Sequence, residues 1–168
     1  MVVALSPMAQ QATSMLFEDR LVEKTYVALV AGHLEHDVGT IDLPVGKVWN
    51  EERGFNEFTC LITSRTEGSS DHATNAESDF VDGSLRDAIT DYKVSQRFTM
   101  SLQDGERKAK YTRVILNPRT GRGHQLRLHM EEIGYSILGD QLHATKNVAE
   151  CTPRLCLHAE SIQMYIFT

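Results

Sequence analysis

The segment Arg119–Arg127, which reads RTGRGHQLR, concentrates polar groups that could bind an anion. Its glycines are typical of a tight turn, and the apolar spacing that follows predicts a helix. Arg122 precedes this helix, and His124 and Gln125 lie in its first turn. Helix N-termini attract anions through their free N–H groups, and arginines bind phosphate or carboxylate through paired hydrogen bonds. The segment therefore predicts an anion site.

Arg127 lies between Leu126 and Leu128, and two roles are open for its guanidinium. Its stem could cover apolar surface while the charge stays in water, or the charge could pair with a buried carboxylate. The spacing alone favours the exposed role.

Metal and cofactor chemistry is not indicated by the sequence. His124 and His129 are five residues apart, which places them about 140° apart around a helix, too far to share a metal. No phosphate-loop, dinucleotide-binding or G-x-S-x-G pattern occurs. The three cysteines contain no C-x-x-C pair. We expect neither a metal nor a cofactor.

The charge is unevenly distributed in this chain of 168 residues and net charge −6. Residues 107–130 hold seven lysines and arginines and no acidic residue, whereas residues 51–91 are strongly acidic. A local basic field binds phosphate whatever the total charge. The alternative is a solvated strand edge protected by cations, and composition leaves both open. No apolar run is long enough to span a bilayer, and MVVALSPMAQQ lacks the basic region and the long apolar run of a signal peptide, so we expect an intracellular protein without membrane association, its compartment open.

The elements that position these residues are predicted from periodicity and caps. Ser6-Pro7 starts an amphipathic helix that runs to about Asp19, and the apolar VVAL before it is typical of a strand. A second helix follows RTGRG and stops at Gly134. Strands are predicted at 24–32, 39–44, 89–98, 110–118 and 154–167, and a turn at 104–105 is predicted to join the third of these to the fourth.

Strands outnumber helices, and turns join most of them, so we predict one α+β domain over residues 1–168. Its core is a mixed, mostly antiparallel bent sheet flanked by a few helices. Residues 64–84 are rich in Ser, Thr, Asp, Asn and Gly, which predicts a flexible insertion.

Four blocks resemble the RluA-like family of RNA pseudouridine synthases. RTGRGHQLRLHMEEIGYSILGD is similar to the pattern T-G-R-x-H-Q-[IL]-R-x-H followed by I-G-x-x-I-x-G-D. EKTYVALVAGHL, AITDYKV and PRLCLHAESI resemble three further blocks of the family, in the same order. The resemblance covers most of the chain outside the predicted insertion.

The resemblance implies the pseudouridine synthase fold and the isomerisation of a uridine that is flipped out of ribosomal or transfer RNA, without a cofactor. By motif position it implies catalytic roles for Tyr26 and Arg127, with Arg127 paired to the family's aspartate. It implies RNA binding through the following residues: Lys24, Arg119, Arg122, His124 and Gln125. We expect a monomer.

One block of the family is not matched. The catalytic aspartate belongs to an H-R-L-D-x-x-T-S-G block just upstream of the strand and helix that VVALSPMAQQATSMLFEDR resembles, and the family adds a hairpin at the C-terminal side. We therefore expect these 168 residues alone to lack synthase activity, and the Arg127 guanidinium to be open to an anion or water. The alternatives are a non-catalytic RNA-binding paralogue, a truncated gene product, or a protein-interaction module.

Overall fold

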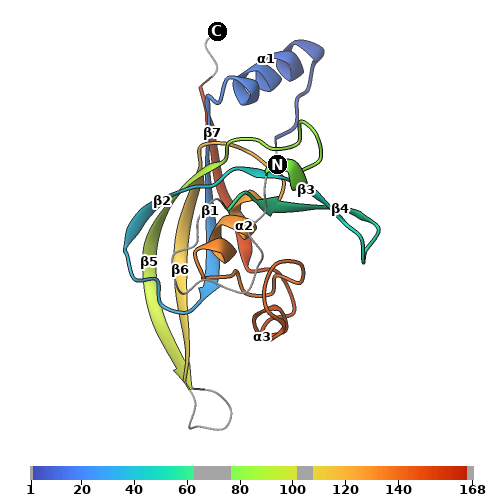
Figure 1. Ribbon diagram of the computed structural model, residues 1–168. Coiled ribbons are helices and arrows are strands. Elements are labelled where there is room, and N and C mark those ends of the chain that lie inside the picture. Colours follow the sequence, from blue (N-terminus) through green and yellow to red (C-terminus); the bar gives the residue numbers. More distant parts are fainter. Residues whose placement is uncertain (1, 63–76, 102–107, 166–168) are drawn as a thin grey trace.

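A twisted five-stranded sheet forms the body of the protein, with strand order β2-β5-β6-β1-β7 (Figure 1). The computed structural model describes residues 2–62, 77–101 and 108–165. All paired strands in these ranges run antiparallel. The strands are β1 (Val22–Ala31), β2 (Val38–Asp42), β3 (Val45–Asn50), β4 (Phe55–Cys60), β5 (Ile89–Ser101), β6 (Lys108–Pro118) and β7 (Leu157–Met164). The helices are α1 (Pro7–Glu18), α2 (Gln125–Glu132) and α3 (Lys146–Ala149), with a 3-10 turn at Glu77–Asp79.

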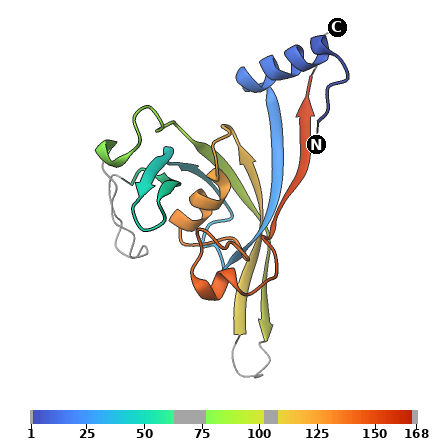
Figure 2. The ribbon, with the colours of Figure 1, turned by 90° about the vertical axis from the view of Figure 1, so that its right-hand side faces the viewer.

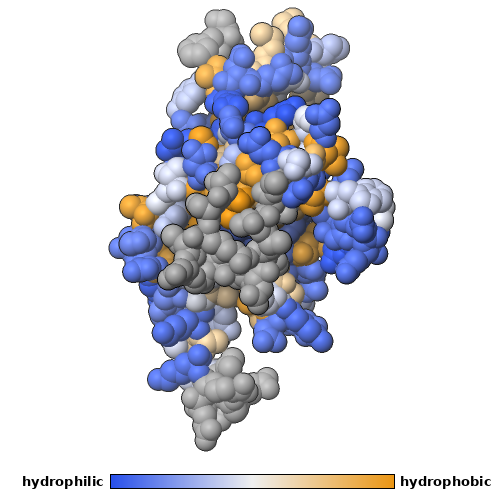
Figure 3. All heavy atoms as spheres, viewed as in Figure 1, coloured by the Kyte–Doolittle hydropathy of each residue, from blue (hydrophilic) through white to orange (hydrophobic). Residues whose placement is uncertain are grey.

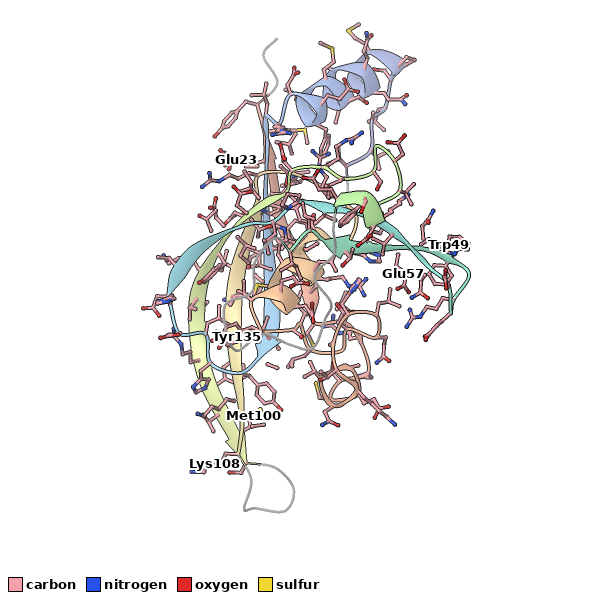
Figure 4. The ribbon with its side chains drawn as sticks, in the orientation of Figure 1. Glu23, Trp49, Glu57, Met100, Lys108 and Tyr135 are labelled. Carbon is pink, nitrogen blue, oxygen red and sulfur yellow. The ribbon has the colours of Figure 1, made fainter. Side chains whose placement is uncertain are left out.

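The strand predictions for the large sheet are confirmed, as is the α+β, mostly antiparallel fold class. β1 lies between β6 and β7, and Tyr26 of β1 pairs with Leu116 and Ala159. β5 and β6 form the predicted hairpin, whose far end is marked by Met100 and Lys108 in Figure 4. The predicted turn of this hairpin, at 104–105, lies outside the described residues.

A second, two-stranded sheet of β3 and β4 was not predicted. Its hairpin extends from the body, and Trp49 lies near its end (Figures 1 and 4). Val45 and Cys60 pair at its base and are buried, whereas Trp49 and Phe55 are more than half exposed.

Helix α2 joins the two sheets because its apolar side chains point into two cores. Leu126 and Met130 pack with Ala28 and Val30 of β1 in the main core. Leu128, on the other side of the helix, packs in a smaller core at the base of the β3–β4 hairpin. This double anchorage fixes the N-terminus of α2, where the candidate site lies.

Helix α1 forms as predicted but buries none of its residues. Ser6 caps it by accepting a hydrogen bond from the Ala9 N–H at 3.1 Å, and Pro7 occupies the first position. Met8 and Met15 of the predicted apolar face are 80% and 53% exposed. Residues 2–5 do not form the strand predicted for VVAL, because no strand pairs with them in the described part of the chain.

The last eight residues of the predicted insertion, 77–84, lie in the described part of the chain. Residues 77–84 pack against β3: Phe80 is 8% exposed and forms a bridge with Val48. Its ring lies so close to Gly46 that a Cβ there would come within 2.4 Å of it. One apolar anchor therefore orders a stretch whose average composition is polar. The rest of the prediction, residues 64–76, lies outside the described residues.

None of the helices in the described ranges is long and apolar enough to cross a membrane. Hydrophilic residues cover most of the face shown in Figure 3, with hydrophobic residues exposed between them. The ends of β1 and β7 lie beside α1, on the other side of the molecule from the β3–β4 hairpin (Figure 2).

Candidate active site

A cavity of about 260 Å³ lies between β1 and the N-terminus of α2. It is lined by Lys24 and Tyr26 of β1, by residues of the loop from Pro118 to His124, and by Arg127. Tyr26 and Arg127, both predicted from the resemblance, therefore share one cavity. We call it the base cavity, after the base that the family resemblance leads us to expect beside Tyr26.

Gln125 holds the loop that forms the wall of this cavity. Its Oε1 accepts hydrogen bonds from the Thr120 hydroxyl and from the Arg122 N–H, both at 2.9 Å. Its Nε2 donates to the Ile89 carbonyl and the Thr90 hydroxyl, both at 3.0 Å. Gln125 is 3% exposed. These bonds fix the loop to β5, and the predicted contact of Gln125 with RNA stays a prediction.

Arg127 forms a side-on pair with Asp140, contrary to the expectation that its guanidinium is open. Nε donates to Oδ2 at 2.8 Å and Nη2 donates to Oδ1 at 2.5 Å. The side chains are 16% and 1% exposed, so the spacing-based preference for a surface role is also wrong. The physical reason is the chain turn that ends at Gly139, which returns Asp140 to the helix that carries Arg127.

Asp140 is a structural carboxylate whose oxygens are all engaged. Besides Arg127, the backbone N–H groups of Leu142 and His143 donate to its Oδ1 at 3.0 and 3.1 Å. Burial acts to raise the pKa of Asp140, but the Arg127 guanidinium and the two N–H groups outweigh it and hold the pKa below its usual value. A carboxylate so buried and so fully bonded cannot attack a substrate.

The pair with Asp140 leaves one edge of the guanidinium unused. Asp140 takes Nε and one N–H of Nη2, and Nη1 has no hydrogen-bond partner among the described residues. Since Arg127 lines the base cavity, this edge can bind a second anionic group there.

His124 and His143 form a neutral pair beside this ion pair. Nδ1 of His124 lies 2.9 Å from Nε2 of His143, and the Phe58 ring contacts His124 at 5.2 Å between centroids. Burial lowers the pKa of His124, and the charge of Arg127 adds to this. Burial also lowers the pKa of His143, to about 4. The pair links the β3–β4 hairpin, through Phe58, to the wall of the base cavity.

We expect protein stability to fall as the pH is lowered from 6.5 to about 4. In this window His143 binds a proton in the unfolded chain but not in the folded one, so lowering the pH favours unfolding. The lowered pKa values of His124 and His129 act in the same direction. Urea unfolding across this range tests the effect, and His143→Gln should flatten the profile. An unchanged profile in the variant would contradict the assignment.

Lys24 lies at the rim of the base cavity. Its Nζ donates to the Thr120 carbonyl at 3.4 Å, and it forms no ion pair within the described ranges. Burial lowers the pKa of Lys24, as expected for a partly desolvated ammonium without an acidic neighbour.

The two loop arginines are held by different groups. Arg119 is exposed and forms a bidentate pair with Asp91, at 2.6 and 2.8 Å. That pair holds the pKa of Asp91 below its usual value, mainly through the hydrogen bond. Arg122 is half-buried, and its Nε donates to the Asp87 carbonyl at 3.0 Å. Both keep further N–H groups for a ligand.

His129, the other histidine of α2, is separate from this site. It is fully buried, with Nδ1 2.9 Å from the Thr90 hydroxyl and Nε2 3.0 Å from the Leu43 carbonyl. The described part of the chain holds no group of three or more histidine, cysteine or acidic side chains that could bind a metal ion.

Comparison with known proteins decides which family this site belongs to. Residues 1–132 match the model of a family described as RNA pseudouridylate synthase. The chain belongs to the RNA pseudouridylate synthase family. The dual-specificity RNA pseudouridine synthase RluA of Pasteurella multocida is 35% identical over 159 residues, covering 95% of this chain and 58% of that protein. The protein of the same name from Escherichia coli K12 is 33% identical, covering 96% and 59%.

Solved structures of human proteins confirm the pseudouridylate synthase fold. Human RNA Pseudouridylate Synthase Domain Containing 1 superposes with a TM-score of 0.70 at 26% identity, covering 94% of this chain and 55% of that one. Human RNA Pseudouridylate Synthase Domain Containing 4 has a TM-score of 0.59 at 24% identity and shares the fold. The chain spans about three fifths of the length of the curated relatives.

Three residues of the candidate site were missed by sequence reasoning. Asp140 is the last residue of the I-G-x-x-I-x-G-D block, but this motif did not predict a role for it. His143 and Phe58 lie in segments without a motif, and only the fold brings them to His124.

Proposed function

We propose that this chain forms the base-binding part of an RNA pseudouridine synthase, which isomerises uridine in RNA to pseudouridine. The observation that carries the proposal is that Tyr26 and Arg127 line one cavity, while Nη1 of Arg127 has no hydrogen-bond partner among the described residues. The substrate is ribosomal or transfer RNA, and the protein acts as a monomer.

Each side chain has a defined task in this proposal. The Tyr26 ring offers an aromatic surface for the flipped uracil. Asp140 holds the guanidinium of Arg127 in one orientation, and the Nη1 edge binds the carboxylate of the family's catalytic aspartate. An arginine next to that carboxylate keeps it ionised, as nucleophilic attack requires. Arg127 is therefore shared between a structural and a catalytic carboxylate.

The reaction breaks the bond between C1′ of the ribose and N1 of uracil and forms a bond between C1′ and C5. The hydrogen on C5 leaves as a proton and N1 gains one, so the net change is an isomerisation. Release of tritium from uridine labelled at C5 therefore reports each turnover.

A chimera tests the catalytic proposal. The N-terminal segment of a relative that carries the H-R-L-D-x-x-T-S-G block is joined to Met1, and tritium release is measured on RNA labelled at C5 of uridine. We expect turnover by the chimera and none by the 168 residues alone. Arg127→Ala in the chimera should abolish turnover while RNA binding persists. A folded, RNA-binding chimera without turnover, or turnover by the unextended chain, would contradict the proposal.

RNA binding should depend on Arg122. Arg122→Ala should weaken binding of the 168-residue chain to a fluorescein-labelled RNA hairpin with a uridine-rich loop. It should also flatten the salt dependence by about one phosphate contact. Fluorescence anisotropy at several salt concentrations measures both. An unchanged salt slope would remove Arg122 from the interface.

A further inference from the structure

A second cavity, of about 290 Å³, lies behind the base cavity, between the end of α1 and the loop after β6. Its lining includes four cationic side chains and one acidic side chain: Arg20, Lys24, Arg119, Arg122 and Glu18. No sequence pattern pointed to Arg20 or to this cavity. We call it the basic cavity.

The positive charge in the basic cavity is only partly compensated. Arg119 shares its charge with Asp91, but Lys24 and Arg122 bond only to backbone carbonyls among the residues that the structure describes. The side chain of Arg20 makes no hydrogen bond or ion pair in the described part of the chain. Lys24 and Arg122 are partly buried, whereas Arg20 and Arg119 are exposed. A bound anion would form charge-assisted hydrogen bonds with all four cations and replace the hydration that the two partly buried ones have lost.

Arg20 occupies a backbone position that favours glycine. It follows the C-cap Asp19 with φ 59°, in the left-handed region. The Arg20 N–H donates to the Phe17 carbonyl at 3.3 Å and the Leu21 N–H donates to the Leu16 carbonyl at 2.9 Å, as in a Schellman motif. An arginine is unfavourable at this position of the motif. In the described part of the chain, the Arg20 side chain makes no hydrogen bond or ion pair that could offset this cost. Its presence therefore points to a use in binding.

The basic cavity and the base cavity share one wall. Four residues line both cavities: Lys24, Thr120, Gly121 and Arg122. Gly121 adds no side chain to this wall, and a Cβ there would lie 3.4 Å from Nζ of Lys24. A nucleotide with its base beside Tyr26 would therefore bring its backbone to the basic cavity.

We propose that the basic cavity binds one phosphodiester group of the RNA, adjacent to the flipped nucleotide, with Arg20 as its dedicated ligand. This inference rests on the proposed function, because it takes the base beside Tyr26 to be that of an RNA nucleotide. It adds a specific phosphate and a residue outside the four matched blocks to the predicted contacts of Lys24, Arg119 and Arg122. A free phosphate ion has the same chemistry, and the test below distinguishes the two.

Arg20→Gly separates a role in binding from a role in folding. Glycine suits the left-handed position, so the melting temperature should be unchanged or higher. Affinity of the 168-residue chain for the labelled RNA hairpin should fall about tenfold, as expected for one charge-assisted contact. The salt slope should flatten by about one contact. The matched control is Arg53→Ala, which removes one exposed arginine from the β3–β4 hairpin, remote from α1 (Figures 1 and 2).

A set of hairpins with one neutral methylphosphonate linkage each locates the phosphate. When the neutral linkage is the one that Arg20 contacts, next to the flipped uridine, Arg20→Gly should cause no further loss of RNA affinity, because the contact between Arg20 and that phosphate is already lost. The inference would be overturned if Arg20→Gly and Arg53→Ala lost equal RNA affinity. It would also be overturned if the loss of affinity in Arg20→Gly did not depend on which linkage is neutral. Inorganic phosphate that competes at concentrations close to those of the RNA would indicate a phosphate-ion site instead. If the wild-type chain binds no RNA, the proposed function itself is contradicted. If Arg20→Gly binds RNA as tightly as the wild type, only the inference about the basic cavity is contradicted.

Discussion

Asp140→Ala will lower the free energy of unfolding by about 3 kcal/mol or more, the range found when one partner of a buried ion pair is removed. The substitution leaves the guanidinium of Arg127, only 16% exposed, without its counter-ion. It also leaves the N–H groups of Leu142 and His143 without their acceptor. Urea unfolding followed by circular dichroism measures the change.

The chain provides a matched control for this prediction in its second bidentate arginine–aspartate pair. Arg119 and Asp91 have similar geometry, but their side chains are 60% and 34% exposed. Water screens this pair, so Asp91→Ala should cost no more than about 1 kcal/mol. If Asp140→Ala and Asp91→Ala lower the free energy of unfolding equally, burial of the ion pair does not determine how much stability is lost when the pair is broken.

A double variant separates the cost of an orphaned charge from the value of the pair. Arg127→Met with Asp140→Ala removes both charges, so no buried ion is left without a partner. The double variant should be more stable than Asp140→Ala alone, because Arg127→Met then removes a penalty. If the losses simply add, the two side chains do not interact as the structure indicates.

The predictable part of this fold is the part encoded locally. β1, β5, β6 and α2 follow from alternation, a cap or a glycine stop, each within a short stretch of sequence. The alternation in β3 and β4 is weak, because Gly46, Lys47 and Asn56 interrupt it and the only large buried side chains of these strands are Val45 and Cys60. That hairpin therefore gave no strand signal.

The sequence predicted which residues line the site, but it did not predict the ion pair between Arg127 and Asp140. Motif position placed Tyr26 and Arg127, and the structure puts them in one cavity. Spacing on a helix says nothing about a carboxylate 13 residues further along, so the Arg127–Asp140 pair was not foreseen. Phe80 shows the same limit, because one buried side chain outweighs the polar composition around it.

We expect the second large effect from Gly139→Ala, because Gly139 lies in the turn that brings Asp140 to Arg127. Gly139 has φ 76°, and a Cβ there would lie 2.0 Å from the Arg154 carbonyl oxygen and 2.5 Å from the Thr152 hydroxyl. Backbone atoms cannot rotate away, so the segment before β7 must shift. We expect a loss of at least about 3 kcal/mol in the free energy of unfolding, combining the left-handed strain with the displaced contacts.

Gly134→Ala isolates the conformational part of that loss. Gly134 has φ 86°, but nothing lies within 4 Å of a Cβ built on it, so its replacement adds backbone strain without a clash. It should cost about 1 to 2 kcal/mol. The difference between the two variants, measured by urea unfolding, is the cost of moving the Arg154 carbonyl. If the two losses are equal, the contact between Gly139 and the segment before β7 is not tight, and the orientation of Asp140 must be set by its own hydrogen bonds alone.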